Sequence, residues 1–289
     1  MGQLKVIKPG FYTTIQDGGR FGYKKFGVPV SGAMDSRAME AANRIVGNEA
    51  GSAVLECTFD GGEYEFETKA KIAITGAEAE ILINNKQVAP YQALEIKIGD
   101  RLKIGYPKRG MRSYLAIRGQ LVVPKVMESY STYVPGAFGG FEGRPLKAND
   151  ILRWNLTSDK EIIETETEFQ IPYFSSKLTL DVCPGPEWNW LNEHQKQRLF
   201  DGEYIVESTS NRMAIRFSGE TIETKLPDMK SSAVAPGIIQ LPPSGIPILL
   251  MKDAQTIGGY PRILHVANYQ LWRAGQVRPG DRIRFRIVD

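Results

Sequence analysis

The sequence predicts a mainly β protein with a few helices, an α+β chain whose core is built largely from strands. Three observations predict it: short apolar runs recur between turn residues, three of these runs follow the same kind of turn, and only two stretches have helical spacing. Regularly spaced short strands are typical of β-barrels and sandwiches. With 289 residues and 42% hydrophobic content, the chain can form one large domain or two smaller ones, each with a core.

Ten runs are predicted strands, because apolar and β-branched residues concentrate there between turn residues. They are residues 53–58, 71–75, 80–83, 101–104, 112–118, 178–183, 204–208, 214–217, 246–252 and 282–288. Alternating apolar and polar residues follow each of three turns, at Gly99-Asp100, Asn149-Asp150 and Gly280-Asp281. We expect a strand with one buried face to leave each of these turns.

Two stretches have the spacing of helices. Residues 36–46 follow Asp35, a good N-cap residue, and stop at Gly47, which favours a helix end. Residues 187–200 follow Pro186, which is tolerated in the first helical turn, and carry apolar residues at helical intervals. One helix is therefore predicted in each half of the chain.

The boundary between the halves is predicted at residues 158–172, a polar and strongly acidic stretch without a clear period. This stretch is the expected linker. It separates an N-terminal β-barrel half, residues 1–157, from a C-terminal half, residues 173–289.

Composition argues against several classes of protein. The net charge of +3 comes from interspersed charges, without the basic block that tracks nucleic acid. No stretch approaches the roughly 20 apolar residues of a membrane span and no signal peptide is evident, so a cytoplasmic protein is expected. Cys57 and Cys183 form no C-x-x-C pair and are expected in the core. Because His194 and His265 lack partners at metal-ligand spacing, no metal site is predicted.

The first candidate site segment is polar and rich in glycine. Gln16, Asp17 and Arg20 surround two glycines, which suits a backbone folded tightly beside a ligand. Ser31 and Asp35 then flank the start of the first predicted helix, where free N–H groups favour an anion. The alternative is a plain turn followed by a helix cap.

Two further segments have weaker signals. Residues 135–144 contain four glycines and Arg144, and they either wrap an anionic group or form a mobile loop. Residues 208–213 place Ser210 and Arg212 between two predicted strands. Their small polar side chains either serve a site or make local turn hydrogen bonds.

The fourth segment, residues 253–262, directly follows an apolar strand. The end of this strand carries an acid, an amide, a hydroxyl, two glycines and a tyrosine. Such a cluster of polar side chains can orient a small polar substrate. These residues are Asp253, Gln255, Thr256, Gly258, Gly259 and Tyr260. The alternative is a β-bulge or turn.

Together these blocks resemble the allophanate hydrolase subunit 2 family over nearly the whole chain. The similar blocks, in order, are residues 16–20, 27–35, 42–43, 46–48, 55–56, 210–213, 236–240 and 255–261. The family is biotin-dependent carboxyltransferase-like and includes 5-oxoprolinase components, the carboxyltransferase portion of urea carboxylase and a regulatory antagonist. The resemblance implies two cyclophilin-like β-barrel subdomains.

The resemblance also implies an activity. The chain is expected to be one component of a heteromeric, ATP-dependent enzyme that opens 5-oxo-L-proline to L-glutamate with two partners, the A and B subunits, and to be inactive alone. The B subunit would resemble allophanate hydrolase subunit 1. Two alternatives stay open: a regulatory binding protein that antagonises a kinase inhibitor, and the carboxyltransferase component of a biotin-dependent urea or amide carboxylase.

ATP and Mg²⁺ are the expected cofactors, and they would be shared with the B subunit because no P-loop is present. Covalent biotin is not expected, because Lys252 closes a predicted strand and Asp253 follows it.

The expected catalytic residues are Asp17, Arg20, Arg212 and Asp253. The two arginines would pair with carboxylate or phosphate, and an aspartate would act as a base or Mg²⁺ ligand. The expected substrate-binding residues are Gln16, Ser31, Asp35, Asn43, Ser210, Gln240, Gln255, Thr256, Gly258, Gly259 and Tyr260. We expect these loops to converge in one polar cleft.

Overall fold

The computed structural model describes residues 1–156, 169–223, 226–227 and 229–288. It divides into two compact units. The first comprises Met1–Arg20 and Ser31–Phe174, and the second comprises Phe21–Val30 and Ser175–Asp289. The segment Phe21–Val30 therefore groups with the second unit, although the predicted division assigns it to the first half. Residues 158–168 of the predicted linker lie outside the described residues.

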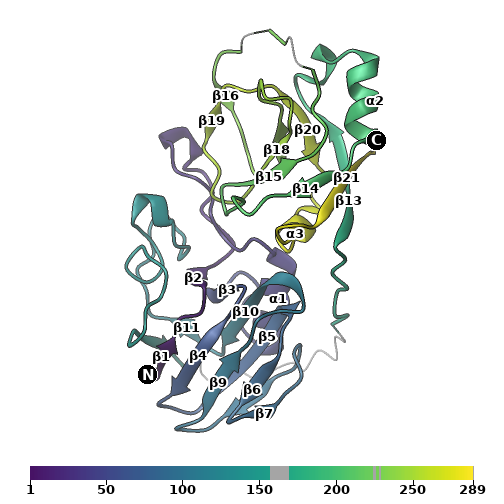
Figure 1. Ribbon diagram of the computed structural model, residues 1–289. Coiled ribbons are helices and arrows are strands. Elements are labelled where there is room, and N and C mark those ends of the chain that lie inside the picture. Colours follow the sequence, from purple (N-terminus) through teal and green to yellow (C-terminus); the bar gives the residue numbers. More distant parts are fainter. Residues whose placement is uncertain (157–168, 224–225, 228, 289) are drawn as a thin grey trace. The chain divides into compact units, whose positions relative to one another are not determined.

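The first unit contains two sheets (Figure 1). Across the seven-stranded sheet lie β11 (Gln120–Leu121), β12 (Ile151–Asn155), β1 (Gly2–Lys8), β4 (Gly62–Phe66), β9 (Arg101–Ile104), β6 (Ile81–Ile83) and β7 (Lys86–Gln87). Across the five-stranded sheet lie β2 (Tyr12–Gln16), β3 (Val54–Thr58), β10 (Arg109–Ile117), β5 (Ala70–Glu78) and β8 (Leu94–Ile96).

The main core of the first unit lies between these sheets. In β1 and β4 of the seven-stranded sheet, successive side chains point to opposite faces. Leu4 and Tyr64 therefore point into the core, while their sequence neighbours are more exposed. They pack in one cluster with Leu55, Ile74 and Leu115 of the five-stranded sheet. Each such side chain contributes about 1.5–3 kcal/mol when fully buried, so this cluster holds the two sheets together.

Helix α1 (Ser36–Ile45) packs against the five-stranded sheet, with Ala38, Met39 and Ala42 in one cluster with Tyr114. The carboxylate of Asp35 caps the helix by accepting a hydrogen bond from the Ala38 N–H at 2.9 Å. The predicted helix and its cap are thus confirmed. The five-stranded sheet is covered on both faces, by α1 on one and by the main core on the other.

The second unit is a closed barrel (Figure 1). Around it lie β13 (Lys177–Pro184), β20 (Arg262–Val266), β17 (Ile238–Gln240), β18 (Ile248–Leu250), β15 (Ala214–Ser218), β14 (Tyr204–Val206) and β21 (Arg282–Ile287). Parallel pairing of β13 with β21 closes the barrel. Tyr204, Phe217 and Phe285 contact one another as its aromatic core. A separate two-stranded antiparallel sheet pairs β16 (Ser232–Ala233) with β19 (Ile257–Gly258).

The second predicted helix, residues 187–200, is wrong as a single element. The chain forms a short 3-10 helix, η3 (Trp188–Trp190), and then a separate α2 (Glu193–Asp201). Leu191 between them is extended, and Asn192 starts α2 with a reciprocal capping box to Gln195. The remaining helices are η1 (Lys24–Phe26), η2 (Val134–Gly136) and α3 (Leu271–Ala274).

The prediction of a mainly β fold is confirmed, and each of the ten predicted strands is present. The three predicted turns lead into β9, β12 and β21. Cys57 is buried, and burial raises its pKa to about 11. Cys183 is only half-buried, because it lies on the outer side of barrel strand β13, so its assignment to the core is wrong.

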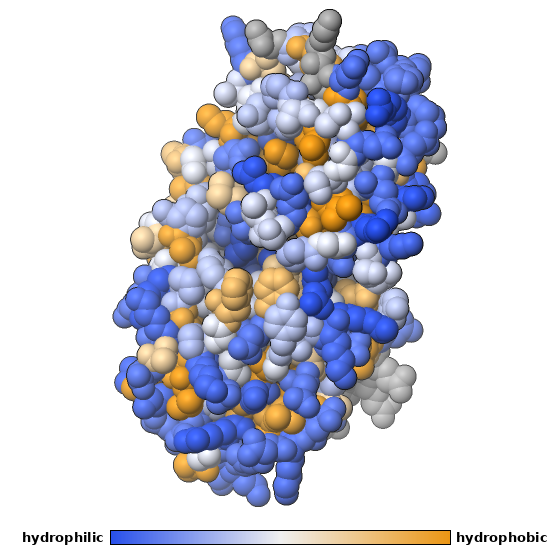
Figure 2. Space-filling model, viewed as in Figure 1, coloured by the Kyte–Doolittle hydropathy of each residue, from blue (hydrophilic) through white to orange (hydrophobic). Residues whose placement is uncertain are grey.

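The face of the protein drawn in Figure 2 is largely polar. Figure 2 shows hydrophilic side chains over most of the face in view, with apolar side chains in small groups between them. Scattered apolar residues of this kind are normal on proteins. Among the described residues, no helix combines the length and the apolar character needed to cross a membrane.

Candidate functional site

The predicted site residues fall into two groups, one in each unit. The first unit holds Gln16, Asp17, Arg20, Ser31, Asp35 and Asn43. The second holds Ser210, Arg212, Gln240, Asp253, Gln255, Thr256, Gly258, Gly259 and Tyr260. Convergence of the two groups in one cleft stays a prediction.

The carboxylate of Asp17 is surrounded by donors. Its Oδ1 accepts hydrogen bonds from the Gly19 N–H at 2.8 Å, the Ser129 hydroxyl at 2.7 Å and the Ser131 hydroxyl at 2.5 Å. Its Oδ2 accepts from the Tyr130 N–H at 2.6 Å. Asp17 therefore fastens the segment around Tyr130 to the turn after β2.

Arg20 fastens the same segment from the other side. Its side chain is fully buried, and it donates to the carbonyls of Val126 at 3.0 Å and Ser131 at 2.9 Å. The guanidinium also lies 4.9 Å from the centre of the Phe138 ring. These contacts suit a residue that holds a loop in place, and its direct contact with substrate stays a prediction.

The glycine-rich segment 135–144 packs its backbone against the protein. A Cβ on Gly139, whose φ is +73°, would lie 2.0 Å from the Ser131 carbonyl oxygen. Arg144 forms a two-pronged pair with Asp150, at 2.7 and 2.9 Å. Close main-chain packing explains the glycine, and the arginine is engaged within the protein.

A main-chain bond joins the two halves of the first predicted segment. The Ala33 N–H donates to the Asp17 carbonyl at 3.0 Å, and a Cβ on Gly32 would lie 2.9 Å from the Gly19 Cα. Ser31 has a φ of +54°, a conformation that non-glycine residues seldom adopt. The structure thus brings the turn after β2 together with the loop that enters α1.

Near this contact, Oε1 of Gln16 and Oγ of Ser31 are buried without a hydrogen-bond partner among the described residues. Gln16 donates through its amide nitrogen to Thr14 and to the Thr132 carbonyl, so only its oxygen is left. An unsatisfied buried polar atom is destabilising by roughly 1–3 kcal/mol. The presence of two unsatisfied buried atoms so close in the sequence suggests that they serve a function, such as binding a ligand.

Asn43 does not belong to this cluster. It follows Asp35 by eight residues, which places it roughly 12 Å further along the helix. Its amide nitrogen donates to the carbonyls of Ala50 and Ser52, and its oxygen accepts from Asn48. Asn43 therefore ties down the chain that leaves α1.

A row of buried polar residues crosses the five-stranded sheet on its α1 side. The register places Thr14 opposite Glu56, Glu56 opposite Tyr114, and Tyr114 opposite Thr75. Burial raises the pKa of Tyr114 well above its usual value. Sequence reasoning missed Glu56 as a site residue, although a single acid inside an apolar strand is a readable signal.

In the second unit, Arg212 and Asp253 form a buried pair. The guanidinium donates through Nε to Oδ2 at 2.8 Å and through Nη2 to Oδ1 at 3.0 Å. The Asp253 N–H also donates to the Arg212 carbonyl at 2.8 Å. This two-pronged ion pair joins the loop before β15 to the loop after β18. The side chain of Arg212 is only 7% exposed and that of Asp253 only 5%.

Four predicted binding residues gather beside this loop. The Gln240 amide donates to the Tyr260 carbonyl at 2.9 Å and accepts from Gln255 at 3.4 Å. Gly258 leaves room for that amide, since a Cβ there would lie 2.8 Å from it. Gln255 is exposed and Tyr260 is 45% exposed, so both can meet a ligand.

The other predicted residues of this unit have structural contacts. The Thr256 carbonyl accepts from the Val234 N–H beside the small two-stranded sheet, and Gly259 is exposed directly after β19. The Ser210 hydroxyl bonds the main chain of Arg216 in both directions. The alternative of local turn hydrogen bonds is therefore what the structure shows for Ser210.

Sequence reasoning missed a second ionic fork in this unit. Arg262 donates to Glu187 through Nε at 2.9 Å and Nη2 at 2.7 Å, and its Nη1 donates to the Ala233 carbonyl at 2.8 Å. The hydrogen bonds from Arg262 lower the pKa of Glu187. This fork ties η3 and β16 to β20, and no local signal marks Glu187.

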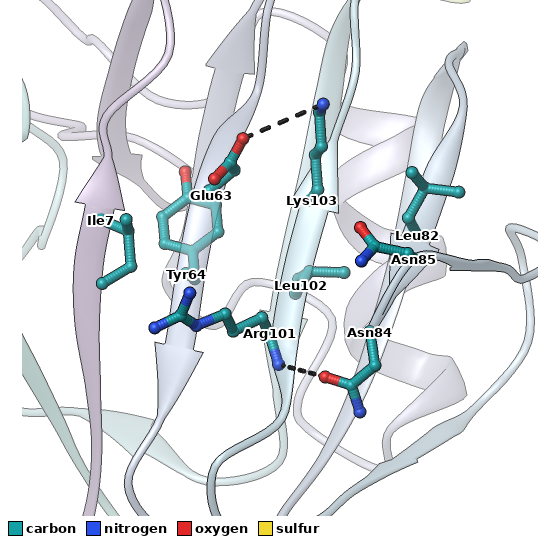
Figure 3. A pocket seen from close by; sticks show the side chains of 9 residues that line it. All are labelled: Ile7, Glu63, Tyr64, Leu82, Asn84, Asn85, Arg101, Leu102 and Lys103. Atoms are coloured by element: carbon teal, nitrogen blue, oxygen red, sulfur yellow. Dashed lines mark hydrogen bonds and ion pairs between the residues drawn. The ribbon is translucent and has the colours of Figure 1, made fainter.

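A groove of about 310 Å³ lies elsewhere in the first unit, on the solvent face of the seven-stranded sheet (Figure 3). Glu63 and Lys103 form a 3.9 Å ion pair there, and the Arg101 N–H donates to Asn84. The groove contains none of the predicted site residues, and cross-strand ion pairs are ordinary on a solvated sheet. The described residues also hold no cluster of three or more acidic, histidine or cysteine side chains suited to a metal ion.

Comparison with known proteins gives consistent matches. The family model described as carboxyltransferase domain, subdomain A and B, matches residues 26–287. The chain is 38% identical to the 5-oxoprolinase C subunit of Escherichia coli K12, over 98% of this chain and 90% of that protein. It is 37% identical to the 5-oxoprolinase C subunit of Haemophilus influenzae, over 95% and 88%. The crystal structure of the K. lactis urea amidolyase superposes with a TM-score of 0.90 at 32% identity, over 99% of this chain but only 19% of that one.

Proposed function

The chain belongs to the family of carboxyltransferase domains, subdomains A and B, and on this basis we propose that it is one component of an ATP-dependent 5-oxoprolinase. With two partners, the A and B subunits, it would open 5-oxo-L-proline to L-glutamate. The single observation that carries the proposal is the similarity to two 5-oxoprolinase C subunits over almost the full length of both proteins in each comparison. The urea amidolyase is a much longer protein, of which the chain spans about a fifth.

The proposed substrate carries a lactam N–H, a lactam carbonyl and a carboxylate. In the first unit, Oε1 of Gln16 can only accept a hydrogen bond, whereas the Ser31 hydroxyl can donate one. These two buried atoms therefore complement the N–H and the carbonyl of an amide. In the second unit, the exposed side chains of Gln255 and Tyr260 are available to a small polar molecule.

In the proposed reaction, ATP transfers its γ-phosphoryl group to the lactam carbonyl oxygen. Water then attacks the carbonyl carbon, the ring C–N bond breaks and the nitrogen takes a proton, which leaves an acyl phosphate. A second water hydrolyses the acyl phosphate to the carboxylate of glutamate and phosphate. The contribution of this chain would be to hold the lactam in position. We assign Asp17, Arg20 and the fork between Arg212 and Asp253 to the positioning of the loops that carry the contacting residues.

Asp17 and Asp253 do not fit a role as Mg²⁺ ligands. The oxygens of Asp17 accept four hydrogen bonds, and those of Asp253 face Arg212. We therefore propose that ATP and Mg²⁺ bind at a surface completed by the B subunit. Because the proposed reaction consumes ATP, we also propose that the complex works in the cytoplasm.

Reconstitution tests this function. The purified chain is mixed with the candidate A and B subunits, ATP, Mg²⁺ and 5-oxo-L-proline, and glutamate is measured with and without avidin. We expect glutamate that depends on all three chains and on ATP, and that avidin does not reduce.

Two other results would each overturn the proposal. Carboxyl transfer that avidin blocks would identify the carboxyltransferase component of a biotin-dependent carboxylase. Tight association with the B subunit without turnover in the complete mixture would identify a regulatory binding protein.

A further inference from the structure

Glu56 is a carboxylate buried in the middle of β3, and it is only 1% exposed. Its Oε2 accepts hydrogen bonds from the Met34 N–H at 2.7 Å and from the Tyr114 hydroxyl at 2.9 Å. Arg112, which is 3% exposed, places its Nε 3.7 Å from Oε1. The loop before α1 and strand β10 therefore both contact this one carboxylate of β3.

The bonds of Glu56 continue to the start of α1. The Tyr114 hydroxyl that donates to Glu56 also accepts a hydrogen bond from the Asp35 N–H at 2.7 Å. Two successive main-chain N–H groups, those of Met34 and Asp35, are thus held by Glu56, one directly and one through Tyr114. These groups belong to the loop that contains Ser31, with its uncommon positive φ.

A charge at this position needs an explanation, because burying a carboxylate is costly unless it is paired and hydrogen-bonded. The guanidinium of Arg112 lies beside the carboxylate, with its Nε 3.7 Å from Oε1, and compensates the charge. Oε2 of Glu56 accepts hydrogen bonds from the Met34 N–H of the loop and from the Tyr114 hydroxyl. Hydrogen bonds to an ionised acceptor are roughly twice as strong as neutral ones, which suits a residue that must hold a strained loop.

We propose that Glu56 is a positioning residue for the substrate-binding loop at residues 31–35. Its carboxylate fixes the Met34 and Asp35 N–H groups, and through them it orients the Ser31 hydroxyl toward the amide group of the substrate. The link to substrate rests on the proposed function, whereas the hold on the loop does not.

The test uses Glu56→Gln in the full chain, assembled with the A and B subunits. Tyr114→Phe is a second variant, which removes only the bridging hydroxyl. Glu65→Gln is the matched control, because Glu65 pairs with Arg101 on the solvent face of the other sheet. Amide hydrogen exchange of residues 34–38 and the separate values of kcat and KM for 5-oxo-L-proline are measured.

We expect exchange at residues 34–38 to accelerate about tenfold in Glu56→Gln, as for the loss of one charge-assisted hydrogen bond. KM should rise by a similar factor while kcat changes less than about threefold, because binding rather than chemistry is affected. Tyr114→Phe should show the same pattern more weakly. Glu65→Gln should match the wild type in both measurements.

Wild-type exchange rates in both Glu56→Gln and Tyr114→Phe would overturn the proposal. Faster exchange with an unchanged KM would overturn the link to substrate binding. If the wild-type assembly forms no glutamate, the proposed function fails, and the exchange rates alone then decide whether Glu56 holds the loop.

Discussion

Eight charged residues among those that the structure describes are at most 6% exposed, and five of them are Arg20, Glu56, Arg112, Arg212 and Asp253. A charge can be retained in such a place only when partners compensate its lost hydration. Main-chain carbonyls accept hydrogen bonds from Arg20, and opposite charges face the other four. At the residue scale, this burial indicates that these side chains hold loops in place rather than contact substrate directly.

The fork between Arg212 and Asp253 gives the first prediction. Arg212→Met should destabilise the protein by about 3–5 kcal/mol, because it leaves the Asp253 carboxylate buried and unpaired. The double variant with Asp253→Leu should recover most of that loss, since no buried charge is left. Urea unfolding of the three proteins measures both effects. A single variant as stable as the wild type would show that Asp253 does not depend on its partner.

Two glycines of the first segment give a matched pair. Gly32 has a φ of +86°, and a Cβ there would lie 2.9 Å from the Gly19 Cα, whereas a Cβ on Gly18 meets nothing within 4 Å. Gly32→Ala should cost about 1–3 kcal/mol of stability and raise the KM of the assembled enzyme. Gly18→Ala should stay within about 0.5 kcal/mol of the wild type. Thermal unfolding measures both variants, and equal effects would contradict the close packing of the two loops.

At the scale of elements, Asp181 connects the two strands that close the barrel. It lies on β13 and is 4% exposed, and its carboxylate accepts from Arg286 on β21 at 2.7 Å. Tyr269 and Gln270, which precede α3, donate to the other oxygen at 2.8 and 2.6 Å. The hydrogen bond from Tyr269, with those from Arg286 and Gln270, holds the pKa of Asp181 below its ordinary value.

This lowered pKa predicts an acid dependence of barrel stability. A carboxylate whose pKa is lower in the folded than in the unfolded protein stabilises the fold above the unfolded pKa of about 3.9. That contribution is lost as the pH falls through the folded pKa. The wild type should therefore exceed Asp181→Asn in unfolding free energy at pH 6, and the difference should shrink below about pH 4.

Urea unfolding over a pH series measures this difference. Asp100→Asn serves as the control, because Asp100 is a half-buried turn residue of the first unit. A difference between wild type and Asp181→Asn that does not change with pH would contradict the lowered pKa.

At the scale of the whole molecule, the question is whether the chain could itself carry biotin. Lys252 follows β18, and its neighbours Met251 and Asp253 donate main-chain hydrogen bonds to Met213 and Arg212 across the loop. We predict that a biotin ligase with ATP and biotin leaves the mass of the chain unchanged, because Lys252 is held between bonded residues. A biotin carrier domain is the positive control. An increase in mass that maps to Lys252 would contradict this prediction.

The sequence predicted much of the fold because its signals are local. The Asp35 cap, the three turns and the ten strands each depend on a few neighbouring residues. Strand β2 was missed because its polar residues suggested a ligand loop, whereas the sheet buries Thr14 opposite Glu56 and Gln16 opposite Val54. The helix at 187–200 was predicted too long because the capping box of Asn192 was not recognised.

For the candidate site, the sequence by itself determined which segments are unusual and which of them carry glycine, charge and amide groups. Only the tertiary structure decided what each charged group touches, because partners such as Arg262 and Glu187, 75 residues apart, meet through strand register. Caps, turns and strands depend on neighbouring residues and can be predicted from them. Burial and ion pairing depend on contacts between segments that lie far apart in the chain.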